Sequence, residues 1–213
     1  MLKLKTQAIL LAAIALAGCK SSMDFDETGG VKIARSACPA VAIATYTGDI
    51  TTFSSPTQRT VGAIDVTASM ANLQTNCTGD SDPIGVTASF YVQATRAAPG
   101  PARQVVLPWF ATMIRGGNDI QSKQTGQVVV SFADGATRGT GHASVTGSVS
   151  RSLATLPPAV LEKITRKRKV GDADAALDPL TEPSVRDAVL KANFEMLVGF
   201  QLSEEQLAYN ATR

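Results

Sequence analysis

Histidine is almost absent from this chain, which has a single one, His142, among its 213 residues. A zinc site with two histidines is therefore excluded, and no Gly-x-Ser-x-Gly motif places a serine for nucleophilic catalysis. A Ser-His-Asp arrangement and a pair of close carboxylates stay open, because the 18 acidic residues allow either by chance. No catalytic residue can be named from the sequence, and we predict neither a metal ion nor a cofactor.

The chain also lacks a large excess of charge of either sign. The chain has 20 Lys and Arg against 18 Asp and Glu, a net charge of +2. A nucleic-acid-binding protein normally concentrates a basic excess on one face, so we exclude nucleic acid as a partner. Long apolar runs are also missing. The apolar run at residues 8–17 supplies about half of the roughly 20 residues that a membrane-spanning helix needs.

The first residues have the layout of an export signal. Lys3 and Lys5 precede the apolar run, and small residues then lead to a cysteine at Leu16-Ala17-Gly18-Cys19. A positively charged start, a short apolar stretch and a cleavage site of small residues are typical of a secretory signal peptide. We therefore predict a signal peptide at residues 1–18 that is absent from the mature protein.

The motif Leu16-Ala17-Gly18-Cys19 resembles the lipobox of bacterial lipoproteins. This resemblance implies cleavage before Cys19 and lipidation of its sulfur, so the protein would contact the membrane through a lipid anchor. Lys20, rather than Asp, follows the cysteine. In this family that implies release to the outer membrane, with the folded part facing the periplasm. Residues 19–36 lack an apolar period, which predicts a lipidated flexible tether.

Two further cysteines, Cys38 and Cys77, remain as an even pair. Exported proteins fold in oxidising compartments, where such pairs form structural disulfides. A redox pair is usually closer in sequence, and the chain has no Cys-x-x-Cys motif. We predict a disulfide between Cys38 and Cys77, and two unpaired thiols are the alternative.

Residues 37–213 have the pattern of a mainly β domain. Short segments alternate apolar and polar residues, which is typical of half-buried strands. Val105–Ile114 is apolar on both faces and predicts a central strand covered on both sides, although Pro108 removes a backbone donor. His142 falls on the polar side of its segment, so we expect it in solvent. Turn signals between the segments favour an immunoglobulin-like antiparallel β-sandwich. The segments are 64–70, 86–93, 105–114, 128–132 and 142–149.

A helical insertion interrupts this pattern at about residues 156–192, before the last strand. Pro158 suits the first turn of a helix and precedes the helical composition of residues 159–169. A second short helix is predicted after Pro183, with Ser184 as its N-terminal cap. The insertion would therefore consist of two short helices joined by a polar loop.

The end of the chain is predicted to return to the sheet. Residues 194–202 alternate with a period of two, and Gly199 disfavours the competing helical interpretation, so we predict a strand. Ser203-Glu204-Glu205-Gln206 has the spacing of a capping box, in which the serine and the glutamine satisfy each other's backbone N–H groups. A last helical turn is therefore expected directly after the strand.

The densest positive cluster of the chain lies at the end of the first predicted helix. Cations at a helix C-terminus offset its partial negative charge, which is the structural interpretation. The alternative is contact with an anionic partner, such as lipid headgroups, phosphates or an acidic protein. The cluster consists of Lys163, Arg166, Lys167, Arg168 and Lys169.

The chain also resembles small, uncharacterised envelope lipoproteins of alphaproteobacteria. The similarity lies in the lipobox, in Ala37-Cys38-Pro39 and in the closing stretches Val198-Gly199-Phe200-Gln201-Leu202 and Tyr209-Asn210. We expect a noncatalytic, lipid-anchored envelope protein with a structural or binding role. Two alternatives stay open: an accessory subunit of an envelope secretion, pilus or transport complex, and a cell-wall or lipid hydrolase.

Overall fold

A computed structural model describes residues 36–55, 57–166, 171–173 and 177–212. The chain divides into two compact units, one of which comprises 35–166 with 176–213, and the other 1–34 with 167–175. Nearly all described residues belong to the first unit, and the following account concerns that unit. The predicted signal peptide, Cys19 and most of the predicted tether lie outside the described residues.

Eight strands form a single sheet with the order β1-β8-β5-β6-β7-β4-β3-β2. Neighbouring strands are antiparallel except β1 and β8, which pair in parallel. The strands are β1 (Ala40–Ile43), β2 (Asp49–Phe53), β3 (Ile64–Thr78), β4 (Ile84–Arg96), β5 (Arg103–Arg115), β6 (Asp119–Phe132), β7 (Arg138–Val149) and β8 (Phe194–Phe200).

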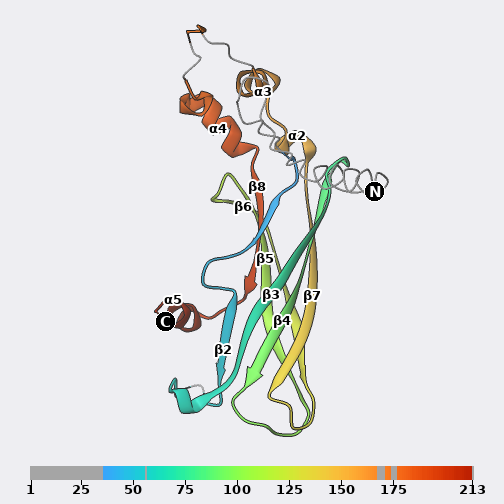
Figure 1. Cartoon of the computed structure of the whole chain (residues 1–213), viewed down its shortest axis with the longest axis vertical. Helices are drawn as coiled ribbons and strands as arrows, with labels where there is room; N and C mark the ends of the chain where they lie inside the picture. Colours follow the sequence, from blue (N-terminus) through green and yellow to red (C-terminus); the bar gives the residue numbers. More distant parts are fainter. Residues whose placement is uncertain (1–35, 56, 167–170, 174–176, 213) are drawn as a thin grey trace, which may run out of the picture. The chain divides into compact units, whose positions relative to one another are not determined.

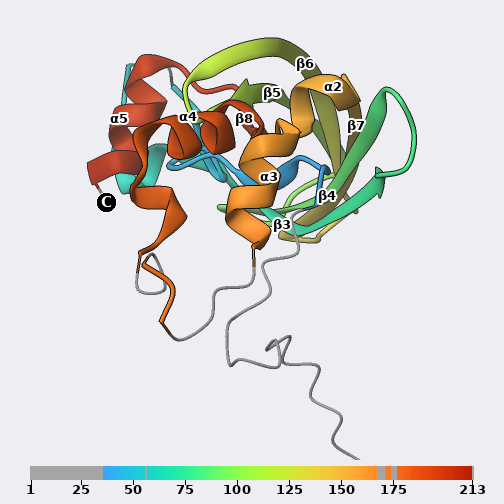
Figure 2. The same cartoon turned by 90° about the horizontal axis from the view of Figure 1, so that it is seen from above.

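The two edges of this sheet meet at the connection between β1 and β2, residues 44–48. On one side the Phe200 N–H of β8 donates to the Thr47 carbonyl at 2.8 Å. On the other side the Met70 N–H of β3 donates to the Gly48 carbonyl, also at 2.8 Å. The sheet therefore curls around one interior, as the view along the strands shows (Figure 2).

The predicted mainly β class is confirmed, whereas the immunoglobulin-like sandwich is not. A sandwich has two separate sheets packed face to face, but here one mixed sheet provides both sides of the core. The physical reason is strand length. β3 has 15 residues and β6 has 14, and the right-handed twist of such long strands turns one sheet over onto itself.

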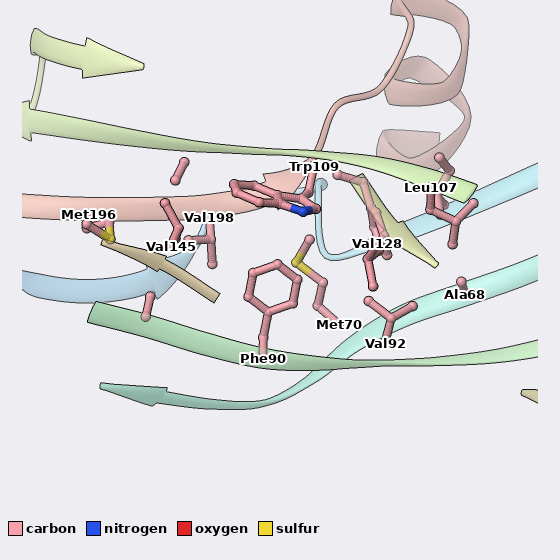
Figure 3. Packing of buried hydrophobic residues seen from close by; sticks show 14 of the residues in the cluster. Ala68, Met70, Phe90, Val92, Leu107, Trp109, Val128, Val145, Met196 and Val198 are labelled. Atoms are coloured by element: carbon pink, nitrogen blue, oxygen red, sulfur yellow. The ribbon is translucent and has the colours of Figure 1, made fainter. Parts of the chain in front are cut away.

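Inward-facing residues fill the curled sheet with apolar side chains. The period-two pattern is strictest in β4, where every second residue from Ile84 to Ala94 is buried. Near the middle, Phe90 packs edge-on against Trp109 with ring centroids 6.0 Å apart, and Figure 3 shows this pair among the surrounding apolar side chains. The interior of the sheet is therefore a packed core.

Gly126 of β6 makes room for the indole of Trp109. The two residues are cross-strand partners, and a Cβ atom on Gly126 would lie only 2.3 Å from Trp109 Cζ2. The indole thus covers the backbone of its neighbouring strand, a pairing known to stabilise sheets that contain glycine. The absence of a side chain at Gly126 is a packing requirement of the core.

The prediction that Val105–Ile114 is covered on both faces is wrong for its first half. Val106 is 51% exposed and its cross-strand partner Val129 is 45% exposed, because no layer covers the outer face of the sheet at these two described residues. Pro108 fits because its carbonyl accepts from the Gln201 N–H at 2.9 Å, on the β8 side. In an antiparallel sheet the backbone N and C=O of one residue face the same neighbouring strand. Those of Pro108 face the β8 side, so the hydrogen bonds between β5 and β6 need no N–H from Pro108.

Short helices connect β7 to β8 and lie at one end of the long strands (Figure 1). α3 ends at Thr165, earlier than predicted, and the backbone N–H of its C-cap residue, Arg166, donates to the Glu162 carbonyl at 2.9 Å. Glu182 rather than Ser184 precedes α4, since Pro183 occupies its first position. The segments are α2 (Arg151–Ala154), α3 (Pro158–Thr165), the 3-10 helix η2 (Pro179–Thr181) and α4 (Pro183–Lys191).

The C-terminal helix α5 (Glu204–Thr212) packs beside the edge strand β2. It begins with the predicted capping box, in which Ser203 N–H donates to Gln206 Oε1 at 2.9 Å and Gln206 N–H donates to Ser203 Oγ at 3.2 Å. Asn210 Nδ2 then donates to the carbonyls of Tyr46 and Asp49 at 2.9 and 2.7 Å. α5 thereby satisfies carbonyls that border the β2 edge and covers it.

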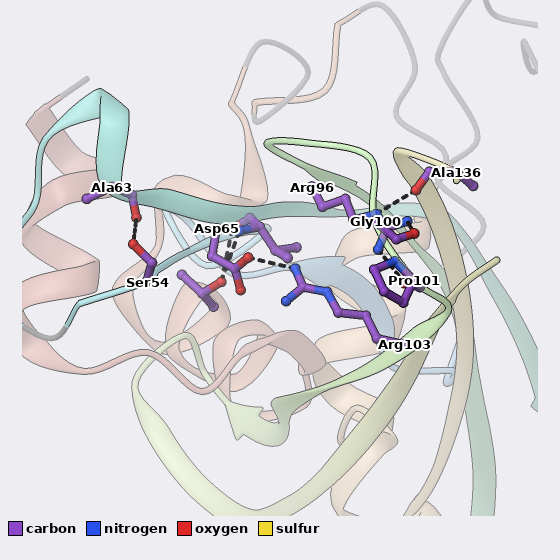
Figure 4. A network of polar contacts seen from close by, with 10 residues as sticks. Ser54, Ala63, Asp65, Arg96, Gly100, Pro101, Arg103 and Ala136 are labelled. Atoms are coloured by element: carbon purple, nitrogen blue, oxygen red, sulfur yellow. Dashed lines mark hydrogen bonds and ion pairs between the residues drawn. The ribbon is translucent and has the colours of Figure 1, made fainter. Parts of the chain in front are cut away.

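The end of the sheet opposite α3 and α4 is closed by Arg96, the last residue of β4 (Figure 4). Its side chain points inward, its exposed fraction is 4%, and its guanidinium carbon lies 5.4 Å from the centre of the Phe132 ring. All of its hydrogen bonds go to backbone carbonyls of the β4–β5 and β6–β7 loops. The acceptors are Ala136 at 2.6 Å, Pro101 at 2.8 Å, Gly100 at 2.5 Å and Ala133 at 3.3 Å.

Replacement of Arg96 by methionine should lower the free energy of unfolding by about 3–5 kcal/mol, because the carbonyls of both loops lose a charged donor that is itself buried. Urea unfolding followed by circular dichroism measures this. Arg138→Met, at an exposed position, is the matched control and should cost less than about 0.5 kcal/mol. Equal losses in the two variants would contradict the closing role of Arg96.

Gly126→Ala should destabilise the protein by about 1–3 kcal/mol, because the added methyl overlaps Trp109 and forces the core to shift. Gly62→Ala is the control, since a Cβ atom there meets nothing within 4 Å. Differential scanning calorimetry should show a lower Tm for Gly126→Ala and an unchanged or slightly higher Tm for Gly62→Ala. A Tm that is unaffected in Gly126→Ala would refute the tight contact.

Candidate functional site

The predicted disulfide between Cys38 and Cys77 is confirmed, with the two Cα atoms 6.1 Å apart. It joins the start of the folded part to the end of β3. Arg151 of α2 binds the neighbouring turn, where its Nη2 donates to the Ser81 carbonyl at 2.7 Å. Its backbone N–H donates to Asp82 Oδ1 at 3.2 Å. The disulfide, this turn and α2 therefore form one connected end of the sheet.

The predicted cationic cluster is only partly described. Lys163 of α3 binds Glu182 through its Nζ, at 2.8 Å from Oε1 and 2.9 Å from Oε2. Arg166 is exposed and follows the last turn of α3. Lys167, Arg168 and Lys169 lie outside the described residues. The structure thus gives Lys163 a role in holding α3 against the start of α4.

The ion pair also affects Glu182. Hydrogen bonds from Lys163 and then from Ser184 lower the pKa of this carboxyl below its ordinary value, because both donors stabilise the ionised form. A lowered pKa in the folded state means that the pair adds stability above the unfolded pKa and loses it as the pH falls through the folded pKa. Glu182 is exposed, so solvent screens the interaction and its contribution is small.

A shallow pocket of about 330 Å³ lies between the β5–β6 turn and α4. Gly116, at a φ of +62°, lets the chain reverse in this turn. The Gly116 N–H donates to the Asn193 carbonyl at 3.0 Å, which ties the turn to the chain after α4. The pocket is lined by Arg115, Gly116, Asn118, Asp119, Asp187, Leu190 and Lys191.

Arg115 is held so that one edge of its guanidinium remains available. Its Nε donates to the Lys191 carbonyl at 2.6 Å, and its guanidinium carbon lies 5.7 Å from the centre of the Phe194 ring. Neither Nη atom donates a hydrogen bond to any described residue. A guanidinium fixed through Nε and an aromatic face can present both Nη atoms to a carboxylate in a bidentate geometry.

The pocket brings together charges of both signs that do not neutralise each other. Arg115 and Lys191 are cationic, and Asp119 and Asp187 are anionic. In the described part of the chain none of these four forms an ion pair. The Asp119 carboxylate accepts a hydrogen bond from Gln121 Nε2 at 2.8 Å, whereas the Asp187 carboxylate accepts none from a described residue. The pocket therefore offers separate cationic and anionic contacts to one bound molecule.

Sequence reasoning did not identify this pocket. The stretch Arg115-Gly116-Gly117-Asn118 has the composition of a turn, which by itself indicates no chemical role. Asp187 and Lys191 belong to α4, far away in sequence, so only the folded chain brings them to the turn. The single local signal is an arginine beside two glycines, which many turns share.

His142 lies on the exposed face of β7, as predicted, with its ring centroid 5.0 Å from that of Tyr91. In the described ranges no group of three or more His, Cys, Asp or Glu side chains could hold a metal ion. None of the helices in those ranges combines the length and apolar character needed to cross a membrane. No protein-family model, curated protein or solved structure matches the chain.

Lys163→Gln should raise the pKa of Glu182 toward its ordinary value, because the main donor to the carboxylate is lost. A ¹³C NMR titration of the Glu182 carboxyl measures the change. Lys191→Gln is the control. Lys191 lies at the other end of α4 and makes no contact with Glu182 among the described residues, so this substitution should leave the Glu182 pKa unchanged. A Glu182 pKa that is the same in the parent protein and in Lys163→Gln would show that the pair does not persist in solution.

Proposed function

We propose that this chain is a noncatalytic, lipid-anchored protein of the bacterial outer membrane that faces the periplasm and has a structural or binding role. The Cys38–Cys77 disulfide carries this proposal, because structural disulfides persist in oxidising compartments outside the cytoplasm. Residues 1–18, which resemble a signal peptide, and the lipobox motif that ends at Cys19 also favour export out of the cytoplasm. The packed interior supports a structural scaffold whose contacts lie on its surface.

The described connections show where the anchor would enter the folded part. The proposed tether joins it directly before Cys38, and the disulfide connects that point to the turn bound by Arg151 of α2. The tether would therefore start from the end of the sheet that carries α2. Contact of Lys163, Arg166, Lys167, Arg168 and Lys169 with an anionic partner belongs to the same proposal. Lys163 would contribute least, since Glu182 already balances its charge.

An accessory role in an envelope complex is the second candidate. Leucines in the described connection between β7 and β8 are exposed: Leu177, before η2, is 62% exposed, and Leu161 of α3 and Leu190 of α4 are each close to half exposed. Exposed apolar residues become candidates for protein contacts where they form one patch. Crosslinking in the native envelope would separate the candidates, because capture of one defined protein complex favours the accessory role.

Mass spectrometry of the protein purified from its own bacterium tests the anchor. We expect a mature chain that begins at Cys19 and carries a diacylglyceryl and an N-acyl group, since two chains already give stable anchoring. Cys19→Ser should remain uncleaved and lack the lipid mass, whereas Cys38→Ser should keep it. A mature amino terminus elsewhere, without fatty acids, would overturn the proposal.

A further inference from the structure

The pocket between the β5–β6 turn and α4 has properties of a prepared binding site. Its two sides are joined by the bonds from Arg115 Nε to the Lys191 carbonyl and from Gly116 N–H to the Asn193 carbonyl, at 2.6 and 3.0 Å. Binding groups held in place by the fold lose little entropy when a ligand arrives. The volume of about 330 Å³ is at the small end of ligand pockets.

The charges of the pocket define what it can accept. A simple anion would be attracted by Arg115 but repelled by the carboxylates of Asp119 and Asp187. A simple cation would be attracted by these carboxylates but repelled by Arg115 and Lys191. A molecule with one group of each sign can use both sets at once, which replaces two repulsive contacts with two charge-assisted hydrogen bonds. Leu190 adds an apolar surface to the lining.

We propose that this pocket binds a small zwitterion, either a free amino acid or a dipeptide. The ligand's carboxylate lies against the two Nη atoms of Arg115, and its ammonium group donates to Asp187. This inference gives the binding role proposed above a ligand class. It does not depend on lipidation of Cys19, so the two ideas can fail separately.

Titration of the full chain in detergent micelles tests this inference with matched ligands. L-Alanyl-L-alanine carries both charges, N-acetyl-L-alanyl-L-alanine only the carboxylate, and L-alanyl-L-alanine amide only the ammonium. We expect the zwitterion to shift the backbone amide signals of Gly116 and Asn118 in ¹⁵N NMR spectra. Its affinity should exceed that of each singly charged form by about tenfold or more, since a charge-assisted hydrogen bond is lost in each. A parallel titration with L-alanine separates the two sources, because it measures whether the free amino acid or the dipeptide binds more tightly.

Two substitutions assign the charges. Arg115→Lys keeps the cation but removes the planar pair of donors, so binding of the zwitterion and of the N-acetyl peptide should both weaken about tenfold. Asp187→Asn should weaken binding of the zwitterion and leave that of the N-acetyl peptide unchanged. Arg186→Gln, on the same helix but outside the pocket lining, is the control and should change neither. Equal affinities for all three peptides, or no shift with any of them, would overturn the assignment.

Discussion

The connection between β1 and β2 is the constraint on which the curled sheet depends. It binds β8 through the Thr47 carbonyl and β3 through the Gly48 carbonyl, so the two edges of the sheet meet at one short piece of chain. Without these bonds β1 and β2 would be ordinary open edges. With them, the apolar faces of all long strands turn toward one interior, and each strand contributes alternate residues to the same core.

This closure also determines where chemistry is available. The interior is filled, with Trp109 packed against Phe90 and over Gly126, and one end is closed by Arg96 and its carbonyl partners. Polar contacts for a ligand are therefore found at the opposite end, where the helices return the chain to β8. The β5–β6 turn reaches the same end, and its arginine meets the carbonyl end of α4.

The local features were predictable from the sequence and the long-range ones were not. The alternation of apolar and polar residues in β3, β4 and β8 predicts which side chains are buried, because every second side chain of a strand faces the core. The disulfide followed from counting cysteines. The single sheet could not be foreseen, because it depends on β1 pairing with β8 from opposite ends of the chain. The cap of α4 was misjudged because Pro183 displaced Ser184 from the cap position, and the pocket depends on contacts between the turn and α4 that no local pattern contains.

The parallel pairing of β1 with β8 has a consequence for how the molecule assembles. Ala40 of β1 pairs with Glu195 of β8, so this ladder joins segments that are far apart in the sequence. Until β8 pairs with them, β1 and the outer side of β5 both present unpaired backbone groups. The curled sheet therefore depends on a non-local contact, which slows folding. A chain truncated before β8 would keep two open edges, and copies of it would tend to associate through them.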